Sequence, residues 1–182
     1  MDDIAYQEMV TDNLKKDSPD EFGNFTKTHA NFIIKSFIES AQEHIEIFSG
    51  SFNDAFYDGL EMFNLLERAA KRIDKPEAIR IITLEQKSEK LMAFVDQVNK
   101  KLGKLVIVYI STIYKGINKL QHFLLVDGKR YRIEESHEPL GDTMPEKTKA
   151  VVCCNRPETV SKWLTYFDGF WDLLRSQLPA NG

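Results

Sequence analysis

Helix-like and strand-like segments alternate along most of this sequence, and that alternation constrains the fold more than any other feature. The helical segments are 28–43, 55–73 and 88–102, and the strand-like runs that follow them are 44–49, 78–84 and 105–110. In the helical segments apolar residues recur at spacings of three and four. The run 105–110 is unbroken and rich in β-branched residues, which is typical of a strand buried on both faces. Strands alternating with helices predict parallel pairing, with helices on both faces of the sheet.

The pattern changes in the last third of the chain. Residues 121–126 and 130–135 flank Asp127 and Gly128, and an Asp-Gly pair between apolar runs predicts a β-hairpin. A last strand is predicted over 149–154, and a closing helix with a strongly apolar stripe follows it. Because the hairpin adds antiparallel pairing, we expect an α/β fold with a mixed, mostly parallel sheet, helices on both faces and one C-terminal hairpin.

The length and composition fit a single domain with a short arm. The chain has 182 residues, of which 42% are hydrophobic and 29% charged, and this composition excludes wholesale disorder. Residues 1–27 are polar and rich in turn formers, so we expect an N-terminal arm with a short or frayed helix and a loop. Residues 28–178 then form the α/β domain. The net charge is −4, so any nucleic-acid binding would require a local basic patch.

The chain shows no pattern for secretion or membrane insertion. The acidic start, Met1 to Asp3, is unlike the basic start of a secretory signal. The apolar run 105–110 is far shorter than the ~20 residues that cross a membrane. Cys153 and Cys154 are neighbours, which does not match the ligand spacing of a zinc site. We therefore expect a cytoplasmic protein with no membrane contact, no metal and no cofactor.

Titratable residues gather around the predicted hairpin, whereas P-loop, dinucleotide-binding, zinc-protease and serine-hydrolase motifs are absent from the sequence. His122 begins one strand of the hairpin, and His137 lies just beyond the end of the other. Such ends meet in an antiparallel pair, so His122, Asp127 and His137 are candidate catalytic residues. The alternative is that both histidines only bond to backbone or water. A metal bound by these three residues is disfavoured, because no helix spacing fixes the ligands.

Residues 120–129, Leu-Gln-His-Phe-Leu-Leu-Val-Asp-Gly-Lys, resemble the active-site strand of the phospholipase D-like superfamily. The motif of that family is His-x-Lys-x4-Asp, usually followed by glycine. Residues 41–50 resemble the family's first strand, and residues 150–171 resemble its last strand and closing helix. The resemblance covers about residues 28–175 and implies a phospholipase D-like fold.

The sequence departs from the family motif at the positions that carry the chemistry. With the register set by Asp127, Leu120 replaces the family's histidine and His122 replaces its lysine. The downstream Gly-Ser-x-Asn falls on 134–137 and keeps neither glycine nor asparagine. In the family, the histidine attacks phosphorus while lysine and asparagine hold the phosphate oxygens. Leu120 cannot be a nucleophile, and the lost lysine removes a cation from the developing charge. The standard mechanism is therefore expected to be absent.

A basic segment follows the predicted turn. Arg130 and Arg132 fall on one face of a strand with Tyr131 between them, a combination that can grip phosphate or stack a base. Glu134 and Glu135 nearby oppose such binding. Arg130 and Arg132 are therefore candidate ligand-binding residues.

Two functional hypotheses follow, and the first is favoured because the motif is incomplete. The first is a catalytically degenerate module that acts by homodimerisation and by binding a partner protein or nucleic acid, in a nucleic-acid or defence context by analogy with single-motif family members. The second is a phosphodiesterase or nuclease with a rewired site, in which His122 is the nucleophile or base and His137 the acid. A flavodoxin- or receiver-like module is disfavoured, because the first strand lacks an acidic end.

Overall fold

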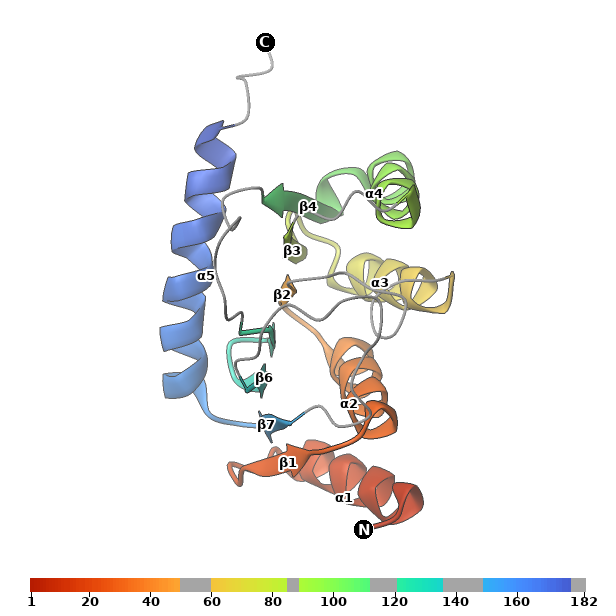
Figure 1. The fold of residues 1–182 in the computed structure, drawn as a ribbon, viewed down its shortest axis with the longest axis vertical. Helices are drawn as coiled ribbons and strands as arrows, with labels where there is room; N and C mark the ends of the chain where they lie inside the picture. The colour runs from red at the N-terminus through yellow and green to blue at the C-terminus, as the bar shows by residue number, and fades with distance from the viewer. Residues whose placement is uncertain (50–59, 85–88, 112–120, 136–148, 178–182) are drawn as a thin grey trace.

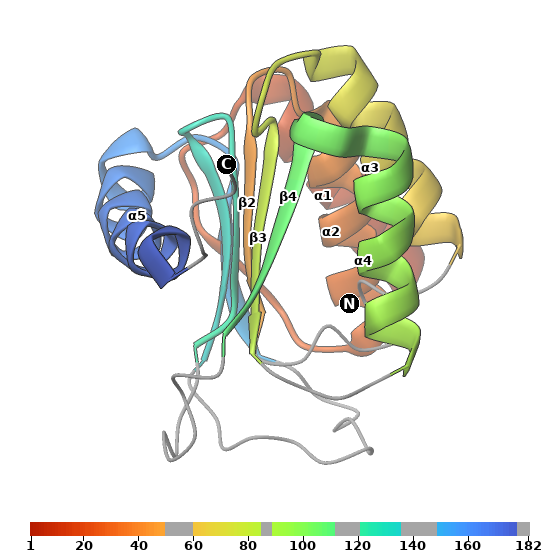
Figure 2. The same cartoon turned by 90° about the horizontal axis from the view of Figure 1, so that it is seen from above.

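The computed structural model describes residues 1–49, 60–84, 89–111, 121–135 and 149–177. The helices are α1 (Asp3–Lys16), α2 (Lys27–Ser40), α3 (Leu60–Ile73), α4 (Glu89–Leu102) and α5 (Pro157–Gln177), with a 3-10 turn at Gly103–Leu105. The strands are β1 (Phe22–Asn24), β2 (Ile45–Ser49), β3 (Ile79–Leu84), β4 (Val106–Ser111), β5 (Phe123–Val126), β6 (Arg130–Glu134) and β7 (Ala150–Cys153). The sheet lies between α5 on one face and α1 to α4 on the other (Figures 1 and 2).

The strand order is β1-β7-β6-β5-β2-β3-β4, and the sheet is mixed. The α/β class, the helices on both faces and the β5–β6 hairpin are confirmed. The parallel share is smaller than the sequence predicted. Among the described strands, β2, β3 and β4 pair in parallel and the other four pairings are antiparallel. Five strands still point one way, because β5 and β7 alone are reversed.

The first 27 residues contribute to the sheet and to the helix layer. α1 begins at an N-cap in which the Asp2 carboxylate accepts a hydrogen bond from the Ala5 backbone N–H, and it ends at Asp17, whose φ is 50°. β1 pairs antiparallel with β7, where a loop was expected. A three-residue strand is too short to show the period-two pattern by which strands are predicted. The boundary at residue 28 stays a prediction.

The sheet separates two apolar layers. One lies under α1 to α4, and the other lies under α5, which crosses the strands from the β7 side to the β4 side (Figure 1). In the α5 layer, Phe167 and Trp171 are buried, as the apolar stripe predicted, while Trp163 and Phe170 are partly buried. A single crossing helix can therefore cover this face.

One edge of the sheet collects most of the strand ends. β2, β3, β4 and β6 end there, and β5 begins there (Figure 2). We call it the carboxyl edge; it is formed by strand ends and differs from the lateral edges of the sheet, which are the strands β1 and β4. Ligands of open α/β sheets bind outside the carboxyl ends of the strands, so this edge is the first place to look for a site.

Candidate functional site

Polar side chains are buried where the strands reach the carboxyl edge. Ser49 ends β2 and Thr83 lies next to the end of β3, and both are buried. His122 precedes β5, and Glu134 ends β6. The backbone N–H of Glu134 donates to the His122 carbonyl at 2.8 Å, which fixes these two ends of the hairpin together.

The Glu134 carboxylate lies between two basic groups. Its Oε2 is 3.4 Å from His122 Nδ1, and its Oε1 accepts a 2.7 Å hydrogen bond from Arg132 Nη2. Arg132 Nε in turn donates to Asn24 Oδ1 at 2.9 Å. Asn24, Arg132 and Glu134 are all buried. We call these four residues the buried polar network. Its charges are paired, as buried charges must be to avoid a large desolvation cost.

The geometry gives His122 a defined orientation. A carboxylate beside Nδ1 favours a proton on that nitrogen and fixes the plane of the ring. A histidine oriented in this way is suited to act as a base or to donate a hydrogen bond. The network is nevertheless a poor phosphate pocket, because Glu134 is anionic and Arg132 directs its charge inward to Glu134 and Asn24. His137 and Leu120 lie outside the described residues, so the predicted approach of His137 to His122 stays a prediction.

Asp127 lies at the opposite end of the hairpin from His122. The four residues of β5 lie between them, so the two are five positions apart, about 16 Å at ~3.3 Å per residue. The Asp127 carboxylate accepts hydrogen bonds from the backbone N–H groups of Gln42, Glu43 and His44, at 2.8 to 3.3 Å. Its own N–H donates to the His44 carbonyl at 3.0 Å. In this arrangement Asp127 ties the hairpin turn to the start of β2, and the structure does not bring it to His122.

The two candidate arginines share one face of β6, as predicted, but both are buried. Arg130 and Arg132 are 9% and 2% exposed. Arg130 Nη1 lies 3.4 Å from Asp127 Oδ2, and its Nη2 lies 3.4 Å from Asp17 Oδ1. Surface phosphate contacts require accessible cations. A ligand-binding role for these arginines stays a prediction, and it would require their present contacts to open.

A second cluster of polar side chains lies on the α5 face of the sheet, at the start of β2, away from the carboxyl edge. Glu46, which is buried, accepts a 2.9 Å hydrogen bond from Arg80 Nη2 and contacts His44 Nδ1 at 3.0 Å. Arg80 Nη1 also donates to Asp168 of α5 at 2.7 Å. The hydrogen bond with Glu46 raises the pKa of His44, against the opposing effect of burial. These contacts join β2, β3 and α5, which indicates a structural role.

The two thiols are poor nucleophiles in this fold. Cys153 and Cys154 are both buried, on opposite faces of the sheet. Burial raises the pKa of Cys153, and it raises the pKa of Cys154 to about 12. A reactive cysteine requires a low pKa and access to solvent. Neither residue is therefore a candidate for catalysis.

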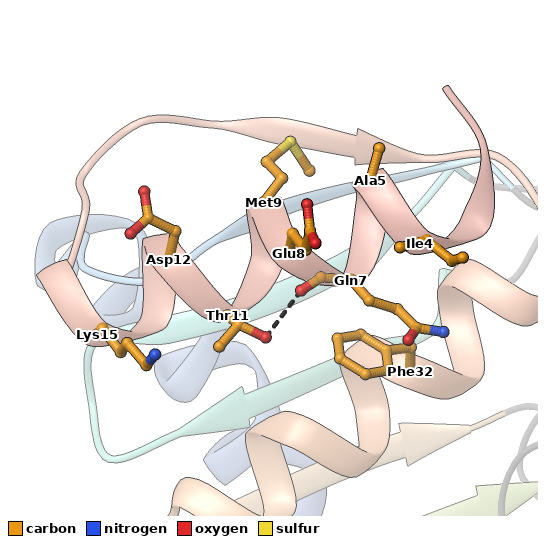
Figure 3. A pocket seen from close by; sticks show the side chains of 9 residues that line it. All are labelled: Ile4, Ala5, Gln7, Glu8, Met9, Thr11, Asp12, Lys15 and Phe32. Carbon is orange, nitrogen blue, oxygen red and sulfur yellow. Dashed lines mark hydrogen bonds between the residues drawn. The ribbon is translucent and has the colours of Figure 1, made fainter.

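An open groove of about 800 Å³ runs along α1 and against Phe32 of α2 (Figure 3). The amide of Gln7 lies beside the Phe32 ring, and Thr11 Oγ1 donates a 2.7 Å hydrogen bond to the Gln7 carbonyl. Exposed Glu8, Asp12 and Lys15 give the groove both signs of charge. The groove contains no member of the buried polar network, so it is separate from the candidate site.

The described part of the chain has neither a metal-ligand cluster nor a membrane-spanning helix. Within residues 1–49, 60–84, 89–111, 121–135 and 149–177, no three His, Cys, Asp or Glu side chains are grouped closely enough to hold a metal ion. In those same ranges, no helix combines the length and the apolar character needed to cross a bilayer.

Comparison with solved structures identifies the fold. Nuc, a phospholipase D family member from Salmonella typhimurium, superimposes with a TM-score of 0.66 at 16% identity, over 85% of this chain and 95% of its own. NucT from Helicobacter pylori gives 0.61 at 14% identity, over 84% and 97%. TrmBL2, described as an archaeal chromatin protein with a novel mode of DNA binding, gives 0.61 at 15% identity, over 93% of this chain and 59% of its own.

These likenesses show that the chain has a phospholipase D-like fold, as the resemblance of residues 120–129 implied. No protein-family model matches the sequence, and no curated protein sequence matches it. With identities of 14 to 16%, the similarity lies in the fold.

The sequence singled out His122 and Arg132, but it did not indicate that Glu134 and Asn24 join them in one network. Glu134 was noted only as a charge that would repel phosphate, and Asn24 was assigned to a loop. One signal was available: Arg132 and Glu134 alternate with apolar residues on a strand that the fold buries on both faces. Two charged residues on one buried face indicate that they pair with each other.

Proposed function

We propose that this chain is a phospholipase D-like module without the catalytic mechanism of that family, and that it acts by pairing with a second copy and by binding a partner protein or nucleic acid. The observation that carries the proposal is the pairing of His122 with Glu134. His122 stands where the family motif has its phosphate-binding lysine, and an anionic carboxylate lies beside it.

Charge balance at the carboxyl edge supports the absence of phosphoryl transfer. That reaction needs cations or hydrogen-bond donors aimed at the phosphate oxygens. Among the described residues of the network, the cation is Arg132. It is 2% exposed and is hydrogen-bonded to Glu134 and Asn24. The Glu134 carboxylate beside it would repel a phosphodiester bound at this edge. The sequence adds Leu120 at the position of the nucleophile.

Pairing of two chains is proposed because the motif occurs once. Family members with one motif resemble half of a two-motif enzyme, and a closed two-fold pair would bring two carboxyl edges together. A stable interface of this kind buries at least ~1,000 Å² in total. Nucleic acid is the preferred ligand class to test first, because the DNA-binding protein TrmBL2 has a similar fold, although this chain matches only 59% of it.

The proposal is tested by measuring hydrolysis and binding on the same preparation. Purified protein is incubated with labelled single- and double-stranded DNA, with RNA and with a chromogenic phosphodiester, with and without Mg²⁺. We expect no turnover above that of His122→Ala, and saturable binding of at least one nucleic acid or of a purified partner. Turnover that His122→Ala abolishes would contradict the absence of catalysis. A monomer without such binding would contradict the binding role.

The oriented His122 ring favours one alternative, a phosphodiesterase or nuclease with a rewired site. In that case His122 acts as nucleophile or base, and Glu134 holds its ring. His44→Ala is a matched control, because His44 also pairs with a carboxylate but lies at the other end of β2. Metal-independent turnover that His122→Ala abolishes and His44→Ala preserves would establish the alternative.

A further inference from the structure

The N-terminal segment reaches the candidate site through β1, the strand that forms one lateral edge of the sheet. Asn24 of β1, Ala150 of β7 and Glu134 of β6 lie in one row across three adjacent strands, because Asn24 pairs with Ala150 and Ala150 with Glu134. His122, just before β5, continues the row, because Phe123 pairs with Ile133 and the His122 carbonyl accepts the Glu134 N–H. Residues directly opposite in an antiparallel pair point to the same face. Asn24 and His122 therefore lie in one row on the same face of the sheet, although they are 98 positions apart in the sequence.

We propose that Asn24 is a positioning residue, which couples the edge strand β1 to His122 through Arg132 and Glu134. The inference deepens the proposed function, because it takes His122 to mark the site. Arg132 is the link. Its Nε donates to Asn24 Oδ1 at 2.9 Å, and its Nη2 donates to Glu134 Oε1 at 2.7 Å. One guanidinium thus holds both Asn24, at one end of the row, and Glu134, the neighbour of His122.

The bridge spans β7, the strand between β1 and β6. Ala150 of β7 lies between Asn24 and Glu134 in the row and is buried. Arg132 is two residues from Glu134 on the same face of β6, and its Nε reaches Asn24 Oδ1 on the far side of β7.

The network is not expected to stabilise the fold more than apolar side chains in the same place would. Ile47, Leu124 and Val152 on the same face are fully buried apolar residues. A buried ion pair usually stabilises a fold no more than apolar residues of the same size would, because both charges must be desolvated. The hydrogen bonds of such a pair hold its side chains in defined positions. Here Arg132 holds the Glu134 carboxylate, which lies 3.4 Å from His122 Nδ1.

α1 lies in the helix layer on the same face of the sheet as the network. Tyr6 of α1 is buried and its ring stacks on His29 of α2 at 3.7 Å. Burial raises the pKa of Tyr6, and the charge of Arg132 opposes that shift. β1 is the element that bonds to Arg132 directly, through Asn24. A partner that displaced β1 from the edge of the sheet would remove the Asn24 oxygen and loosen the orientation of Glu134.

The coupling is tested by nitrogen-15 NMR of the His122 ring, assigned with His122→Gln. Asn24→Leu removes the acceptor and keeps the number and branching of the side-chain heavy atoms. Phe22→Leu is the matched control, because Phe22 lies on the same face of β1 and packs against the apolar layer. We expect His122 to carry its neutral-state proton on Nδ1 in the wild type and in Phe22→Leu. We expect Asn24→Leu to lose that Nδ1–H signal.

Two results would overturn the coupling. One is a folded Asn24→Leu protein in which the ring signals of His122 are unchanged. The other is a wild-type ring that carries its neutral proton on Nε2. If Asn24→Leu does not fold, Asn24→Ser gives the same test, because its shorter side chain keeps β1 but cannot span the distance to Arg132. The NMR result does not depend on hydrolysis or binding, so failure of the coupling and failure of the proposed function are separate outcomes.

Discussion

Replacing Asp127 should destabilise the fold, because its carboxylate holds the hairpin turn to the backbone just before β2. The side chain accepts hydrogen bonds from three successive backbone N–H groups, those of Gln42, Glu43 and His44. It also lies 3.4 Å from Arg130 Nη1, which is largely buried. Asp127 itself has φ 53°, a left-handed conformation that Asp and Asn tolerate better than Ala.

The size of the effect follows from these contacts. A hydrogen bond to a charged group contributes about 1.5–3 kcal/mol net, but water can replace the carboxylate at the exposed Gln42 and Glu43. Counting mainly the partly buried His44 N–H and Arg130, we expect Asp127→Gly to cost about 2–3 kcal/mol. Asp127→Ala should cost about 1 kcal/mol more, because of the left-handed backbone. Asp127→Asn, which keeps one acceptor oxygen, should cost about 1 kcal/mol.

Urea unfolding of the wild type and all three variants at 25 °C measures these differences in the free energy of unfolding, with one m-value used for all four proteins. Asp74→Ala is the control for the backbone cost, since Asp74 is exposed and has φ 48°. An Asp127→Ala protein within about 1 kcal/mol of the wild type would refute the structural role. Equal costs for the Gly and Ala variants would refute the contribution of the left-handed backbone.

Three further predictions concern α5, the second polar cluster, which contains His44, and the assembly of two copies. Trp171→Ala should cost about 3–5 kcal/mol, because this residue is 2% exposed and its ring lies 4.3 Å from Tyr109 and 5.6 Å from Phe167; a loss below about 1 kcal/mol in urea would contradict burial in the core. The pKa of His44 is raised in the folded state, so its contribution to stability should be full below about pH 6.5 and disappear as the pH rises through the folded pKa. Unfolding curves across that range should show this slope in the wild type and not in His44→Gln; identical slopes would contradict it. Light scattering at micromolar concentration should give twice 21.0 kDa if the chain forms the proposed pair, whereas a mass near 21.0 kDa removes it.

The sequence determined most of the secondary structure and the fold class. Three described helices and six strands lie where periodicity and the Asp-Gly turn predicted them, and α5 follows the last strand as expected. The apolar pattern of a helix or strand is a local property, so a single sequence displays it. β1 escaped prediction because three residues are too few for a pattern, and the antiparallel pairing of β1 and β7 reduced the parallel share of the sheet.

The candidate site was determined only in part. The hairpin placed His122 near the end of β6 because both belong to one local motif, and the tertiary structure then supplied Glu134 as its partner. Asp127 lies in the turn, where the sequence placed it, and the tertiary structure supplied the backbone N–H groups that its carboxylate binds. Asn24 could not have been predicted, since its contact with Arg132 spans 108 residues. Such a contact depends on which strands become neighbours, and that order is decided by packing of the whole sheet between its two helix layers.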